Sequence, residues 1–95
     1  MTDIVDHILK VRLAREIAER CYSLHFGVLP WLTLHFDYLE AVRRAHELTV
    51  GQLAEVLLDI AYLWRDGAAL TRSRLVSLIE KAATVRSAVR AEAAD

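Results

Sequence analysis

The residues of this chain best suited to bind a metal ion are one cysteine and two histidines. Cys21 and His25 are four positions apart, so a helix places both side chains on one face. His35 lies at a similar height on the following helix if the two helices form a hairpin around residues 27–28. One sulfur and two imidazoles would suit zinc or copper. No CxxC or HxxxH pair supports this set, so we favour Cys21 as a small buried apolar residue and expect no cofactor.

A second group with binding chemistry is formed by the basic residues Arg72, Arg74 and Lys81. Lysine and arginine bind nucleic acid by neutralising phosphates, which needs a clear excess of positive charge. The region 72–95 holds five basic and three acidic residues, and the whole chain has a net charge of −1. A weak nucleic-acid-binding dimer is therefore an alternative, and a less favoured one than binding to protein.

Patterns that would indicate an enzyme do not occur in the sequence. The Glu-x-x-His pattern that di-iron bundles use is missing, and so are a nucleophile elbow and a phosphate-binding glycine-rich loop. The serines fall on the polar sides of predicted helices. We therefore expect a non-enzymatic protein.

Composition narrows the fold class. The 95 residues are 55% hydrophobic and 26% charged, which excludes a disordered chain and fits one domain over residues 1–95. Three glycines and one proline disfavour a turn-rich β fold, and one cysteine excludes a disulfide scaffold. The acidic N-terminal sequence does not resemble a signal peptide, and no apolar run is long enough to span a bilayer, so we expect a cytoplasmic protein without membrane contact.

Hydrophobic periodicity predicts four helices, over residues 3–26, 30–48, 50–65 and 72–91. Thr2 or Asp3 is expected to cap the first helix, and Thr71 the last. Thr49 and Gln52 form a capping-box pattern at the start of the third helix, and Gly67 is placed to end it. The connections are short, so the predicted fold is an all-α, antiparallel four-helix bundle.

The apolar residues exceed what one small bundle would bury. Before Lys10 the apolar residues lie on the opposite side of the first helix from its main stripe, and the third helix is apolar around nearly all of its circumference. Phe36 points toward the charged side of its helix, near Glu40 and Arg43. We expect an interface that includes Ile4, Val5, Ile8, Leu9, Phe36 and Tyr62.

These observations predict a small helical interaction protein: a regulator, adaptor or inhibitor. Large exposed apolar patches mark partner sites, and a C2 homodimer is the commonest closed assembly. The alternatives are a bundle that binds a metal or ligand through Cys21, His25 and His35, and the nucleic-acid-binding dimer described above.

Overall fold

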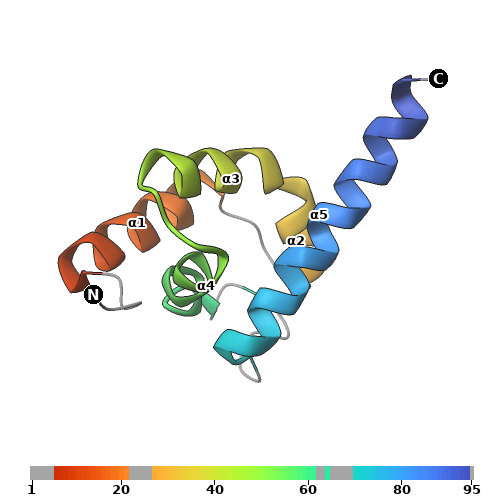
Figure 1. Ribbon diagram of the computed structural model, residues 1–95. Helices are drawn as coiled ribbons and strands as arrows, with labels where there is room; N and C mark the ends of the chain where they lie inside the picture. Colours follow the sequence, from red (N-terminus) through yellow and green to blue (C-terminus); the bar gives the residue numbers. More distant parts are fainter. Residues whose placement is uncertain (1–5, 22–26, 62–63, 65–69, 95) are drawn as a thin grey trace.

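The computed structural model describes residues 6–21, 27–61, 64 and 70–94, and all regular structure in these ranges is helical (Figure 1). The described part contains five α-helices: α1 (His7–Arg20), α2 (Val28–Leu34), α3 (Phe36–Ala45), α4 (Val50–Leu58) and α5 (Arg72–Ala94). The predicted all-α class is confirmed. A four-helix bundle is not confirmed, because the second predicted helix is two helices.

The division between α2 and α3 lies at His35, inside the range 30–48 that was predicted as one helix. His35 has φ −103° and ψ 15°, which bends the chain. The hydrogen bonding continues through the bend, since the His35 N–H donates to the Trp31 carbonyl and the Leu39 N–H donates to the His35 carbonyl. An unbroken hydrophobic pattern is consistent with both a straight and a bent helix, so periodicity did not predict this bend.

The first and third predicted helices are shorter in the structure. Asp6 caps α1, with its Oδ1 accepting from the N–H groups of Ile8 and Leu9, while the expected caps Thr2 and Asp3 lie outside the described residues. Helix α4 ends at Leu58 rather than at 65. There the N–H groups of Asp59 and Ile60 donate to carbonyls three residues back, so the chain tightens into a 3₁₀-type turn. The predicted C-cap Gly67 lies outside the described residues.

Two predicted caps are confirmed. The Thr49 hydroxyl accepts from the Gln52 N–H at 3.1 Å, and the Gln52 side-chain oxygen accepts from the Thr49 N–H at 2.8 Å. The Thr71 hydroxyl accepts from the Arg74 N–H at 3.2 Å in the first turn of α5. Both caps form between residues within one helical turn, so their positions can be predicted from the sequence alone.

Helix α4 lies between α1 and α5 and packs against both (Figure 1). Helix α5 also packs extensively on α2 and more lightly on α3. This central position explains why α4 is apolar around most of its circumference, because its side chains contact neighbours on two sides. The residues of α4 that are buried are Leu53, Ala54, Val56 and Leu57.

Trp31 occupies the centre of the core and is completely buried. Its indole Nε1–H donates to the Cys21 carbonyl, at the end of α1, over 2.8 Å. Its ring meets the Trp64 ring edge-on, with 4.9 Å between the ring centroids. One side chain therefore connects α2 to two segments that are distant in sequence.

Replacing Trp31 by phenylalanine tests this connection. Trp31→Phe leaves the Cys21 carbonyl without its donor and removes part of a buried ring, so we expect the free energy of unfolding to fall by about 2 to 3 kcal/mol. Urea denaturation followed by circular dichroism measures this change. Leu34→Ala on the same helix is the control: Leu34 is 66% exposed, and we expect a loss below about 0.5 kcal/mol. Equal losses for the two variants would contradict the central role of Trp31.

The C-terminal end of α3 is a Schellman motif formed without glycine. The Glu47 N–H donates to the Arg44 carbonyl at 3.2 Å, and the Leu48 N–H donates to the Arg43 carbonyl at 2.9 Å. The motif needs a left-handed residue, and here Glu47 has φ 54°. A side chain at such a position is strained, since its Cβ crowds the backbone.

Glu47→Gly is therefore expected to stabilise the protein. Removing the strained Cβ gains roughly 1 to 2 kcal/mol, and the greater freedom of glycine in the unfolded chain costs part of that, leaving a net gain of about 0.5 to 1 kcal/mol. Glu47→Ala is the matched control, because it removes the carboxylate and keeps the Cβ. A gain in urea midpoint for both variants would assign the effect to charge instead of backbone strain.

Candidate functional site

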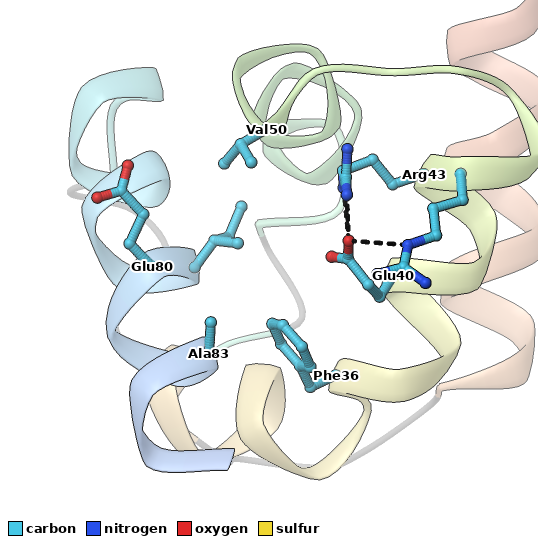
Figure 2. A pocket seen from close by; sticks show the side chains of 8 residues that line it. Phe36, Glu40, Arg43, Val50, Glu80 and Ala83 are labelled. Atoms are coloured by element: carbon cyan, nitrogen blue, oxygen red, sulfur yellow. Dashed lines mark hydrogen bonds and ion pairs between the residues drawn. The ribbon is translucent and has the colours of Figure 1, made fainter. Parts of the chain in front are cut away.

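A hollow of about 280 Å³ lies between α3 and α5, next to the start of α4 (Figure 2). We call it the α3–α5 groove. It has an apolar floor, and its walls are charged. Its lining residues are Phe36, Glu40, Arg43, Arg44, Val50, Ile79, Glu80 and Ala83.

Ion pairs and a cap hold the three helices that form the groove. Both carboxylate oxygens of Asp37 on α3 are paired with α5, at 2.6 Å from Arg86 and 2.6 Å from Arg90. Hydrogen bonding from Arg86 and the charge of both arginines lower the pKa of Asp37. The capping box at Thr49 starts α4 and so places Val50 at the floor.

The wall formed by α3 carries a surplus positive charge. Glu40 accepts hydrogen bonds from the Nε and Nη2 groups of Arg43, and the Nε of Arg44 lies 3.6 Å from the same carboxylate. Arg43 also donates from Nη1 to the Leu48 carbonyl at 3.0 Å. Glu40 and Arg43 neutralise one another within the wall. Arg44, whose side chain is 76% exposed, adds one further positive charge.

The wall formed by α5 carries the opposite charge. Glu80 is exposed and lies across the groove from Glu40 and Arg43 (Figure 2). Among the described side chains no basic group is within ion-pair distance of its carboxylate. The floor between the walls is formed by Phe36, Val50, Ile79 and Ala83, all of which except Ile79 are partly exposed. The groove therefore combines open apolar surface with a net positive charge on its α3 wall, where two arginines share Glu40, and the negative charge of Glu80 on its α5 wall.

The described residues among those predicted for an interface do not form one surface. Phe36 lies in the groove beside Glu40 and Arg43, as its position on the helix predicts. Ile8 is at the surface with 77% of its area exposed, whereas Leu9 is partly buried against the core. Ile4, Val5 and Tyr62 lie outside the described residues.

The exposed side of α1 forms a second apolar surface, separate from the groove. Ile8 and Val11, which is 46% exposed, line a hollow of about 370 Å³ together with His7, Arg12 and Arg15. Around its two apolar side chains this α1 surface presents basic groups. It lies on the far side of α4 from α5 (Figure 1).

Two of the three residues considered as metal ligands, Cys21 and His35, contact Trp31. Cys21 is buried and its carbonyl accepts the Trp31 hydrogen bond, while the His35 ring lies 5.2 Å from the Trp31 ring. Burial raises the pKa of the Cys21 thiol and lowers the pKa of His35, so it favours the neutral form of each group. His25 lies outside the described residues, which contain no group of three His, Cys, Asp or Glu side chains placed to hold a metal ion.

The three basic residues considered for nucleic acid do not share one surface of α5. Arg72 is directed toward α4, where its Nε donates to the Gly51 carbonyl at 3.1 Å. Arg74 and Lys81 are exposed and lie seven residues apart, on one face of the helix. Arg72, two positions before Arg74, lies on a different face.

Five residues of the groove were not predicted from the sequence as part of a site: Arg44, Val50, Ile79, Glu80 and Ala83. They come from three helices, and periodicity shows which side of a helix is apolar but not which helices become neighbours. Comparisons with protein-family models, curated proteins and solved structures gave no match. Within the described part of the chain, every helix is too short or too polar to cross a membrane.

The Glu40–Arg43 pair predicts a loss of stability in acid. Hydrogen bonding from Arg43 lowers the pKa of Glu40 in the folded protein below its ordinary value of 4.5. The unfolded chain therefore takes up this proton first, so the stabilisation is complete above the ordinary pKa and is lost as the pH falls toward the folded pKa.

Urea denaturation at a series of pH values from about 6 to about 3 measures this effect. We expect the stability of Glu40→Gln to decrease less over this range than that of the unaltered protein, because the glutamine side chain does not titrate. Parallel curves for the two proteins would show that Glu40 does not contribute to the acid sensitivity.

Proposed function

We propose that this chain is a small non-enzymatic protein–protein interaction module, a regulator, adaptor or inhibitor, that associates with itself. The observation that carries the proposal is the α3–α5 groove, where partly exposed apolar side chains lie between charged walls. A polar rim around an apolar centre is the usual composition of a protein interface.

The charges favour the groove over the α1 surface for contact between two copies. A C2 contact brings the same surface of both copies together. Two α1 surfaces would bring the arginines Arg12 and Arg15 of both copies near one another, and like charges in contact are unfavourable. The groove has walls of opposite sign, so this repulsion does not arise. The α1 surface is better suited to a different, acidic partner.

The proposal predicts that blocking the groove separates the copies. Ala83→Glu places a larger, charged side chain in the groove from α5, so we expect a dimer in the unaltered protein and a monomer in the variant. Size-exclusion chromatography with light scattering, at tens of micromolar protein and low salt, measures the mass. Ser77→Glu is the matched control, since it adds the same charge at an exposed position of the same helix outside the groove.

Ile8→Glu extends the test to the α1 surface. We expect this variant to remain dimeric, with unchanged helix content by circular dichroism. If Ile8→Glu dissociates the dimer and Ala83→Glu does not, self-association holds and the contact lies on α1. If the unaltered protein is a monomer throughout, self-association is wrong.

A further inference from the structure

The opposite net charges on the two walls of the α3–α5 groove specify how a second copy would dock. Arg44 on α3 and Glu80 on α5 both line the groove, and Arg44 shares the single carboxylate of Glu40 with Arg43. Glu40 is already paired with Arg43, so Arg44 is the surplus positive charge of its wall. Glu80 has no ion-pair partner among the described side chains.

A groove with opposite net charges on its two walls is complementary to itself in charge. A two-fold axis that passes through the centre of the groove and runs along its length places the α3 wall of one copy against the α5 wall of the other. Each contact then occurs twice, as in every isologous interface. The apolar side chains of the two floors, Phe36, Val50 and Ala83, face one another between the walls and are removed from water together.

We infer that a second copy of this chain docks on the groove, with Arg44 of each copy paired to the partner's Glu80. This docking mode rests on the proposed self-association. It adds the surface on which the second copy binds and the ion pairs that fix the orientation of that copy. Ion pairs at the rim of an interface determine orientation and partner choice more than they determine affinity. The partly exposed floor supplies the apolar contact between the two copies.

Reversing the charges one at a time tests the pairing. In Arg44→Glu both contacts become Glu–Glu, and in Glu80→Arg both become Arg–Arg. We expect each variant alone to dimerise at least about tenfold more weakly than the unaltered protein, because like charges meet twice. Analytical ultracentrifugation at low salt measures the dissociation constants, and circular dichroism verifies that both variants are folded.

Mixing the two variants gives a result that a folding defect would not produce. In a heterodimer of Arg44→Glu with Glu80→Arg, one chain has glutamate at both positions and the other has arginine at both, so both contacts are favourable. We expect the equimolar mixture to form this heterodimer, seen as the mixed mass by native mass spectrometry. The double variant Arg44→Glu/Glu80→Arg is expected to dimerise with itself, since its two contacts are also of opposite sign.

The outcomes separate this inference from the proposed function. If the unaltered protein dimerises and the single variants dimerise equally well, the Arg44–Glu80 pairing is wrong while self-association stands. If the single variants are monomers and neither the mixture nor the double variant recovers the dimer, the pairing is also wrong. If the unaltered protein is a monomer, both the inference and the proposed self-association fail.

Discussion

The hydrogen bond from the Trp31 indole to the Cys21 carbonyl is the contact on which the arrangement of the helices depends. It joins the end of α1 to α2, and the edge-on packing of Trp31 against Trp64 adds a third segment. A buried carbonyl at a helix end needs a donor, and here the donor is also the largest side chain in the core. Trp31 therefore both donates a hydrogen bond to the buried Cys21 carbonyl and fills the core.

Helix α3 has a different support, because only Leu39 of its residues is buried. Partly buried apolar side chains, Phe36, Tyr38 and Val42, pack against the core, and Asp37 attaches α3 to α5 through Arg86 and Arg90. The α3–α5 groove lies where this lightly buried helix meets α5, with Phe36 and Ala83 among its lining residues.

The sequence predicts those parts of the structure that depend on neighbours along the chain. The capping box of Thr49 and Gln52, the Thr71 cap and the location of Phe36 beside Glu40 and Arg43 all involve residues within two turns. The bend at His35 and the early end of α4 at Leu58 depend on how the helices pack, and the local pattern is compatible with longer helices in both places. For the same reason Phe36 is identifiable from the sequence as an unusual aromatic, whereas Glu80 and Ala83 become its neighbours only through the fold.

The structure divides the excess of apolar residues into two parts with different explanations. The apolar circumference of α4 is accounted for by its position between α1 and α5, so it requires no second chain. The exposed side chains of α1 and the groove floor are not accounted for in this way. Of these two surfaces, the hollow on α1 has only basic groups among its charged lining residues, whereas the groove has a net positive charge on its α3 wall and the negative charge of Glu80 on its α5 wall. A surface that is to meet its own copy must avoid opposing like charges, and the groove satisfies this condition through Arg44 and Glu80 on opposite walls.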